Sequence, residues 1–574
     1  MTEKRRTRHN GRYFLRYCSR SSPPPHFNKP PFAMKFIDLE KLEDAGSIKA
    51  DLCIVGSGPA GATIAKELAG SKIQVLIVEG GGTEQTPANQ ALYDVENLGA
   101  DRATPQDRVR NRVVGGSSHT WAGRCVSLDD IDFETRGWVP HSGWPISLQD
   151  VYPFLDRSRK YLGIGPNIYD DRLWKQLGLS PLRPRIDPAF LKSQFWQYSR
   201  DECNPPEPTR FSRTVAGMNA SNVRLLMHAN VTQINTSEDG ARVKSLEVRT
   251  PDGRSAEVQA KTVVLACGAL ENARLLLASN KIARAGVGNS HDLVGRFLMD
   301  HPGCTLGLFD PRRSVAIQSR FGCYFLDHKD GRSLYAFGLK LSPEIQHKEQ
   351  LLNCAAFLPQ APSADESWSA LKRLVRSGAE PCRPSRVKDA AIVIGDLPWL
   401  LGNVYRRVAR RQAPILRIDE PSLYCSVEQT PNPSSRVTLG RQTDALGIPL
   451  LRIDWRIGEL ERRSVLRLNE LVGAELRRAG LPEYVPNKHL SEDVNWRSQF
   501  IDRAHPSGTT RMSDSPRQGV VDRNCRVHGV GGLYIAGSSV FPTAGHANPT
   551  LMIVALAIRL ADWLKRHEFT NDAA

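Results

Sequence analysis

A single histidine stands in the sequence HPSGTTRM, residues 505–512, among small and hydroxyl-bearing residues. No cysteine or second histidine lies near enough in the sequence to complete a metal site with His505. An imidazole titrates near neutral pH, so in its neutral form it can take a proton from a substrate hydroxyl. This stretch alone allows two interpretations of His505: a loop residue that stabilises a turn, or a catalytic base.

A second polar group near the C-terminus could complement such a base. The sequence ANPTLMIVALAIRLADWL, residues 547–564, has apolar residues at helical spacing. We expect Asn548 to be its N-cap and Pro549 its first helical residue. An asparagine amide cannot act as a base, but it can donate a hydrogen bond to a developing alkoxide. Because capping and catalysis compete for one side chain, the helix sequence leaves both roles of Asn548 open.

The elements that must position these groups begin with a nucleotide-binding pattern. In DLCIVGSGPAG, residues 51–61, an apolar run typical of a buried parallel strand precedes G-x-G-x-x-G. Gly56 permits a tight turn, Gly58 lets the backbone approach a pyrophosphate, and Gly61 lets the next helix pack closely. A second strand, in QVLIVEGGG, ends at Glu79, which can accept a ribose hydroxyl and would repel a 2′-phosphate. The motif predicts FAD or NAD and disfavours NADP.

Two later segments favour FAD. Residues 261–279, KTVVLACGALENARLLLAS, indicate another strand, Gly turn and helix. Residues 532–542, GLYIAGSSVFP, indicate a third strand with a Gly turn, almost at the C-terminus. A nucleotide domain that the chain leaves and re-enters is a common flavoprotein arrangement. We therefore predict an α/β fold, in which a Rossmann-like FAD-binding domain is interleaved with an α+β substrate domain on an antiparallel sheet.

The expected domain organisation divides the chain into six segments. They are a disordered basic tail (1–33), FAD-binding segments (34–150, 211–300 and 501–574, the last with the catalytic residues) and substrate-domain segments (151–210 and 301–500). Within the last of these, SLYCSVEQT, residues 422–430, alternates as a strand does. Glu428 in this stretch could reach the pocket, but we favour a surface carboxylate.

Composition limits the possible partners. The tail holds eight Lys or Arg and one acidic residue, so +7 of the net +16 lies there, and no nucleic-acid partner is expected. The tail has no apolar core, which argues against a secretory signal, and Met34 could be an alternative start. A second basic stretch, 372–411, could form a membrane-surface or partner-binding patch, but a solvated helix face is favoured. No apolar run approaches the roughly 20 residues of a membrane span, so membrane contact is not expected.

Cysteine usage points to a reducing compartment. The 11 cysteines are scattered along the chain and form no CxxC pair. A disulfide framework would be denser, and a zinc site would show paired spacing. We expect reduced thiols, a cytoplasmic location and no metal site.

Four motifs follow one another along the chain: VGSGPAGA with VEGG, VVGGSSHTW (113–121), CGALENARLLL (267–277) and a C-terminal block. That block contains NPSSRVTLG, HPSGTTRM and LYIAGSSVFPTAGHANPTLMIV. In these motifs and their order the sequence resembles the glucose–methanol–choline (GMC) family of flavin oxidoreductases. The resemblance covers residues 48–566, and the C-terminal block looks closest to the branch of sugar and polyol oxidoreductases and pyranose oxidases.

The resemblance implies a role for each matched residue. His505 lies in the family's H-x-x-G-T motif, which would place it over the flavin to handle the substrate hydroxyl. Asn548 aligns with the second catalytic position, whereas His546, two residues earlier, could line the pocket. The residues expected to bind FAD are Gly56, Gly58, Gly61, Glu79, Gly115, Gly116, Ser117, Thr120, Val231, Gly537, Ser538, Pro549 and Thr550.

One motif departs from the family in a way that concerns FAD attachment. Several members bond FAD covalently through a histidine five residues after the first Gly of GGSSHTW, and Thr120 occupies that position here. His119 is one residue early, and in an extended segment this shift would point its side chain the opposite way. We therefore expect non-covalent FAD.

The predicted function is oxidation of a CH–OH group of a sugar, glycoside or polyol to a carbonyl, with hydride transfer to flavin N5. Oxygen, a quinone and a redox protein all remain open as the electron acceptor. The alternative is an NAD-linked or sterol-type alcohol oxidoreductase. A third hypothesis is a non-catalytic module that binds partners through its arginine-rich stretches.

Overall fold

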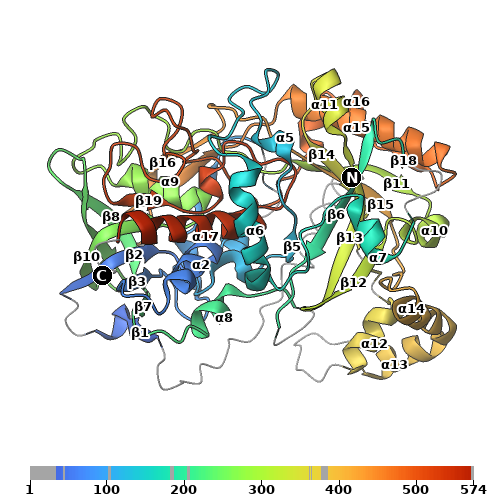
Figure 1. Cartoon of the computed structure of the whole chain (residues 1–574), viewed down its shortest axis with the longest axis horizontal. Helices are drawn as coiled ribbons and strands as arrows, with labels where there is room; N and C mark the ends of the chain where they lie inside the picture. The colour runs from blue at the N-terminus through green and yellow to red at the C-terminus, as the bar shows by residue number, and fades with distance from the viewer. Residues whose placement is uncertain are drawn as a thin grey trace.

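The computed structural model describes residues 34–569, apart from residues 43–45, 101, 103–104, 181–185, 203–206, 361, 364 and 376–385. The predicted tail, residues 1–33, lies outside the described residues. Two large sheets lie side by side in the molecule, one formed around the N-terminal strands and one around the central part of the chain (Figure 1).

The first sheet collects distant segments into one parallel layer. Its parallel strands run in the order β1 (Lys35–Asp38), β7 (Val223–Met227), β3 (Val75–Val78), β2 (Ser47–Val55), β10 (Ser255–Leu265) and β19 (Leu533–Ile535). Strands β9 (Val243–Arg249) and β8 (Asn230–Thr236) extend the layer in antiparallel fashion. Strands β2, β10 and β19, which precede the three predicted Gly turns, are therefore neighbours.

Helices cover this sheet and begin where its strands end. Helix α2 (Pro59–Leu68) follows β2, and α9 (Ala269–Ala278) follows β10. The C-terminal helix α17 (Thr550–His567) packs against α2 and α6 (Leu148–Leu162), as Figure 1 shows. The carboxyl ends of β2, β10 and β19 thus meet the starts of α2, α9 and α17 near one edge, where α/β sheets bind ligands.

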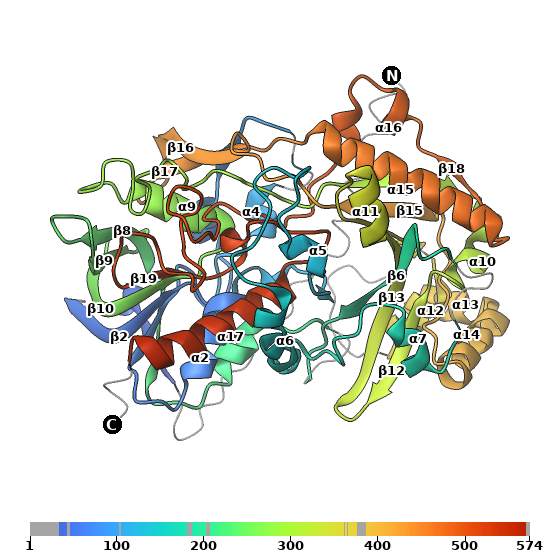
Figure 2. The ribbon, with the colours of Figure 1, turned by 45° about the horizontal axis from the view of Figure 1, so that its top comes forward.

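The second sheet is antiparallel throughout. Its order is β18 (Tyr484–Pro486), β11 (Gly303–Phe309), β15 (Ser422–Val427), β14 (Cys354–Phe357), β13 (Gly331–Leu341), β6 (Leu191–Tyr198) and β5 (Arg124–Cys125), and β12 (Cys323–His328) also pairs with β13. The long helix α15 (Glu459–Arg478) packs on it (Figure 2). The predicted fold class, a Rossmann-like layer together with an antiparallel sheet, is confirmed.

Smaller elements complete the fold. A three-stranded sheet joins β16 (Arg436–Thr443), β17 (Pro449–Asp454) and β4 (Val95–Asn97). The short helices are α3 (Pro87–Ala91), α4 (Gln106–Val109), α5 (Asp130–Phe133), α7 (Arg172–Leu177), α8 (Phe211–Ala216), α10 (Ser314–Gln318), α11 (Pro343–Glu349) and α16 (His489–Glu492). Among the described residues, no helix combines the length and the apolar character needed to cross a membrane.

The second basic stretch forms a group of helices at one corner of the molecule (Figure 1). These helices are α12 (Ser367–Val375), α13 (Arg386–Gly395) and α14 (Leu397–Ala409). Their exposed surface is not only charged, since Val387, Leu401 and Val408 are all more than half exposed. Helices α13 and α14 are largely exposed, as the solvated-face interpretation expects, and apolar side chains share that surface with the charged ones.

The strand over residues 422–427 forms as predicted, but Glu428 does not lie at the surface. Its carboxylate is fully buried and bonds both terminal nitrogens of Arg136, at 2.5 and 2.8 Å. It also accepts the Asn353 backbone N–H at 3.1 Å. A carboxylate can be buried in this way because a bidentate guanidinium replaces the water that it loses. Glu428 is thus a structural residue behind the sheet.

Candidate active site

One large cavity is lined by residues of both major sheets. Its volume is about 3310 Å³, and its walls include the Gly-rich turn after β2, the loop of His505 and the cavity face of the antiparallel sheet. Ligand pockets are commonly about 300–1,000 Å³. The cavity therefore has room for a dinucleotide cofactor and a second molecule together.

The nucleotide end of the cavity is built around Gly58 and Glu79. Gly58 is the N-cap of α2, and a Cβ added there would meet no atom within 4 Å. The backbone can therefore be approached closely at a helix N-terminus, where phosphates bind. Glu79 is almost completely buried, and its carboxylate accepts the Ser57 hydroxyl at 2.6 Å and the Gly81 N–H at 2.9 Å. Burial raises the pKa of Glu79.

Most of the residues predicted to bind FAD face this cavity. Two of them, Gly61 and Gly115, are not among the lining residues. A Cβ at Gly61 would lie 1.9 Å from the Gly56 carbonyl oxygen, and one at Gly115 would lie 2.3 Å from the Ser212 nitrogen. Both glycines therefore serve close backbone packing. The predicted residues that do line the cavity are Gly56, Gly58, Glu79, Gly116, Ser117, Thr120, Val231, Gly537, Ser538, Pro549 and Thr550. This arrangement fits FAD.

The structure brings His505 and Asn548 together in the cavity wall, although 43 positions separate them in the sequence. The Asn548 amide nitrogen lies 3.4 Å from His505 Nε2. An amide NH₂ can only donate, so Nε2 must be the acceptor in this contact. Nε2 therefore carries a lone pair, and its partner Asn548 lines the cavity together with His505.

A second histidine explains why Nε2 carries the lone pair. His301 Nδ1 lies 3.0 Å from His505 Nδ1, and His301 Nε2 lies 3.2 Å from the Ala544 carbonyl oxygen. Because a carbonyl only accepts, the proton of neutral His301 must be on Nε2, which leaves its Nδ1 as an acceptor. His505 Nδ1 must then donate to it. The hydrogen bonds therefore assign to His505 the tautomer with a proton on Nδ1 and none on Nε2.

The loops that carry the two histidines are joined through Asp300. This fully buried carboxylate accepts the backbone N–H groups of His301, Arg503 and His505 at 2.7, 3.0 and 3.0 Å. Its other oxygen lies 2.7 Å from Arg102, which also contacts Asp502 at 3.0 Å. Sequence reasoning missed these residues and His301. The stretch MDHPG, residues 299–303, was a signal, since it places a histidine directly between an aspartate and a proline just before β11.

The surroundings of His505 keep its ring neutral. Burial, and next the neighbouring His301, lower the pKa of His505 from 6.5 to about 3. Burial also lowers the pKa of His301. Two protonated rings with nitrogens 3.0 Å apart would repel each other strongly. Both imidazoles are therefore uncharged at neutral pH, and His505 can accept a proton.

Comparison with known proteins agrees with this geometry. Residues 51–405 match the family model described as FAD dependent oxidoreductase, and residues 431–557 match the one described as GMC oxidoreductase. The chain belongs to the GMC family of FAD-dependent oxidoreductases. The family resemblance seen in the sequence motifs is thereby confirmed.

Individual relatives of this GMC oxidoreductase are distant but match over most of their length. The fructose dehydrogenase large subunit of Gluconobacter japonicus is 23% identical, over 90% of this chain and 98% of its own. The 2-methyl-1,2-propanediol dehydrogenase of Mycolicibacterium austroafricanum is 24% identical, over 90% and 95%. The crystal structure of formate oxidase, 18% identical, has a TM-score of 0.55 and covers 92% of this chain and 100% of its own. The structural likeness shows a shared fold.

The start of α17 in this GMC oxidoreductase differs by one residue from the prediction. Pro549 is the N-cap, and its carbonyl accepts the Ile553 N–H at 2.9 Å. Asn548 therefore precedes the helix and does not cap it. The competition between capping and catalysis does not arise, and its amide is free to meet His505.

The GGSSHTW segment is also not extended. Residues Gly116–His119 form a 3-10 helix, so the premise of strand-like alternation was wrong. The ring of His119 is held at the Val114 carbonyl oxygen, which lies 2.9 Å from its Nε2. Thr120 lines the cavity, whereas His119 does not.

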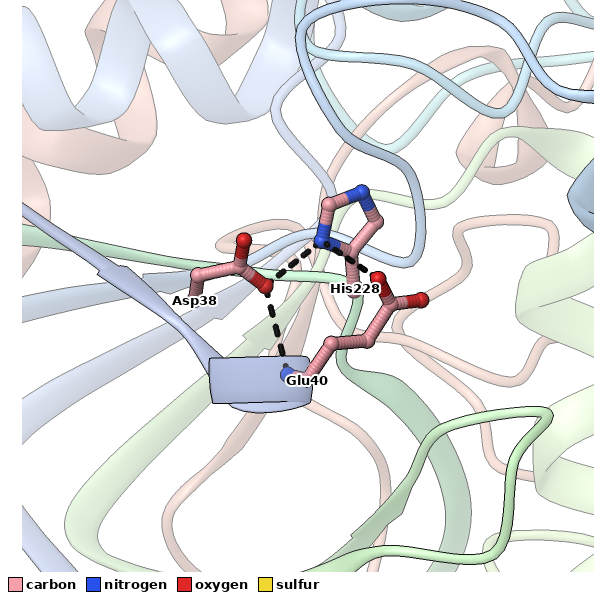
Figure 3. A group of neighbouring side chains, drawn as sticks. All are labelled: Asp38, Glu40 and His228. Atoms are coloured by element: carbon pink, nitrogen blue, oxygen red, sulfur yellow. Dashed lines mark hydrogen bonds and ion pairs between the residues drawn. The ribbon is translucent and has the colours of Figure 1, made fainter. Parts of the chain in front are cut away.

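Two other histidines of the GMC oxidoreductase lie outside the cavity wall. His546 is 4% exposed, and its Nε2 lies 3.8 Å from Asp129, so it does not line the pocket. His228 lies beside Asp38 and Glu40 (Figure 3), with Nδ1 at 2.7 Å from the Asp38 carboxylate. Asp38 also accepts the Glu40 N–H and contacts Lys41 at 3.1 Å. Protein groups thus already satisfy this carboxylate.

Proposed function

We propose that this chain oxidises a CH–OH group of a sugar, glycoside or polyol to a carbonyl, with His505 as the base and Asn548 as the group that stabilises the alkoxide. The observation that carries the proposal is the free Nε2 of His505 beside the Asn548 amide in the cavity wall. A neutral imidazole next to an amide donor suits removal of a hydroxyl proton.

The chain's own residues account for the proton and for the developing charge. His505 Nε2 takes the hydroxyl proton as the carbonyl forms, and the Nδ1 proton stays in its bond to His301. The Asn548 Nδ2–H group would turn from Nε2 to the substrate oxygen while that oxygen is negative. FAD, when bound, supplies the acceptor for the hydride that leaves the carbon.

The substrate class rests on the relatives and on the size of the cavity. Two of the relatives that align over nine-tenths of this chain are named for a sugar and for a diol. A cavity of about 3310 Å³ leaves space for more than a small alcohol. Anaerobic mixing with sugars, glycosides, polyols and simple alcohols would test the proposal. Bleaching by simple alcohols alone would contradict the substrate class.

We also propose that FAD is held without a covalent bond. Thr120 has no ring nitrogen, and the imidazole of His119 is bonded to the Val114 carbonyl. Acid precipitation of the purified protein should therefore leave the yellow colour in the supernatant. A yellow pellet, with a peptide that carries the mass of FAD at His119, would contradict this expectation.

His301 is proposed as a positioning residue that sets the tautomer and the pKa of His505. The activity of a base is lost as the pH falls through its pKa. Because the pKa of His505 is lowered to about 3, the acid limb of kcat/KM should lie well below pH 6.5. Since His301 contributes to the lowering, His301→Asn should raise that pKa and move the limb to higher pH.

A second variant separates this role from simple packing. His301→Leu removes the acceptor for the Nδ1 proton, so flavin reduction should slow by about 10- to 100-fold, in line with a lost buried hydrogen bond. His301→Asn can still offer an oxygen to Nδ1 and should be faster than His301→Leu. Stopped-flow reduction across pH measures both effects. An unchanged acid limb in His301→Asn would restrict His301 to a structural role.

A further inference from the structure

Arg124 is a cationic side chain in the cavity wall that the proposed chemistry does not use. It lies in β5, at the edge of the antiparallel sheet, and lines the cavity together with His505. Its guanidinium carbon lies 4.3 Å from the ring centre of Trp196 and 3.8 Å from that of Phe357. Aromatic rings therefore cover this cation, and its N–H groups are left at the edges of the stack.

No anion of the protein balances this charge. Within the described residues, no carboxylate lies in ion-pair distance of Arg124, and its buried Nε–H has no hydrogen-bond partner. Burial lowers the pKa of Arg124 to about 10, so the side chain stays protonated at neutral pH. The side chain is partly exposed in the cavity wall, and an arginine without an anionic partner there suits bidentate binding of an oxyanion.

Two other arginines of the cavity wall already have protein partners. Arg110 lies 2.8 Å from Glu271, and Arg210 donates to the Ser118 carbonyl. Arg503 stacks on Tyr424 at 4.9 Å and, like Arg124, contributes positive charge that lowers the pKa of His505. Arg124 and Arg503 thus add positive potential at His505 from the wall of the same cavity.

From this arrangement we infer that the substrate carries an anionic oxygen group, a carboxylate or a phosphate, which Arg124 binds while His505 acts on the hydroxyl. The inference rests on the proposed function, because it concerns the substrate of that same site. Arg124 would fix the anion by paired hydrogen bonds and thereby select acidic sugars or hydroxy acids over neutral sugars. Trp196 and Phe357 would hold the guanidinium plane in place.

Binding of small anions to the oxidised holoenzyme tests the inference without turnover. Acetate and inorganic phosphate are titrated while the flavin spectrum and the heat of binding are recorded. The wild type should bind at least one of them. Arg124→Met keeps a side chain that packs between aromatic rings, and it should weaken this binding by about 10- to 100-fold. Arg407→Gln is the matched control, since Arg407 also lines the cavity and stacks on Phe325 but is exposed.

Kinetics then connect the site to the substrate. Glucuronate, glucose 6-phosphate and glucose distinguish a carboxylate, a phosphate and no anion on one sugar frame. Arg124→Met should raise KM for the acidic compound about 10- to 100-fold and leave its kcat nearly unchanged.

Equal anion binding by wild type and Arg124→Met would overturn the inference. So would slower reduction by neutral and acidic substrates alike, because Arg124 would then act on the flavin. If neutral sugars bleach the flavin and acidic sugars do not, the inference of an anionic substrate is overturned, whereas the proposed function stands.

Discussion

Replacement of His505 by alanine is expected to slow anaerobic flavin reduction by about 10²- to 10⁴-fold, the range that general-base catalysis supplies. The variant loses the Nε2 acceptor beside Asn548 and leaves the amide in place. FAD content should stay normal, because the variant leaves Gly58 and Glu79 of the cavity wall unchanged. Stopped-flow spectroscopy with a substrate that bleaches the wild type measures the effect.

His489→Ala is the matched control for this variant. His489 also lines the cavity, but its side chain is 69% exposed and it has no contact with Asn548 or His301 among the described residues. Its removal should leave the rate within about threefold, as is usual for an exposed side chain away from the reacting atoms. Near-normal flavin reduction in His505→Ala would show that another group removes the substrate hydroxyl proton.

Replacement of Gly58 by valine should give folded protein with little or no flavin. The backbone at Gly58 has φ −65° and ψ −172°, which a branched residue can adopt, and a Cβ there meets no protein atom within 4 Å. The added side chain therefore fills only the space into which a pyrophosphate must come. A loss of about 1.4 kcal/mol already weakens binding tenfold, and a steric block should exceed that.

Absorbance of the purified protein and thermal unfolding in excess FAD measure the two parts of this expectation. Gly137→Val is the control, since Gly137 also has open space around an added Cβ but lies outside the cavity wall. Normal flavin content in Gly58→Val would place the phosphates elsewhere. A loss of flavin in both variants would indicate a general loss of folding.

The local motifs were predictable because the physics that fixes them acts within a few residues. The turn at Gly56, the helix after Gly58 and the strand that ends near Glu79 each follow from neighbouring residues. The start of α17 was one residue off, since Pro549 supplies the first helical carbonyl. Helix ends are set by single hydrogen bonds, which a sequence pattern does not resolve.

The rest of the site depends on contacts between distant segments. His301 and Asp300 meet the loop of His505 across about 200 positions, and no local pattern announces that meeting. Glu428 was misplaced for a related reason. One face of strand β15 packs on α15, and the other contributes to the cavity wall. Nearly all of its residues are buried, so its alternating sequence does not distinguish a buried face from a solvent face.

The late position of β19 and α17 in the sequence determines when this flavoprotein can acquire its cofactor during synthesis. The Gly-rich turn at Gly58 leaves the ribosome early, but its neighbouring strand β19 and the residues at the start of α17 are made last. At about 5–20 residues per second, the intervening chain takes on the order of 25–100 s to produce. Strands β3, β7 and β10 can join β2 during that interval, but the edge of β10 at Val263–Leu265 stays unpaired until β19 is made. We therefore expect FAD to bind stably only after β19 and the start of α17 have been made, because both complete the cavity wall or its sheet.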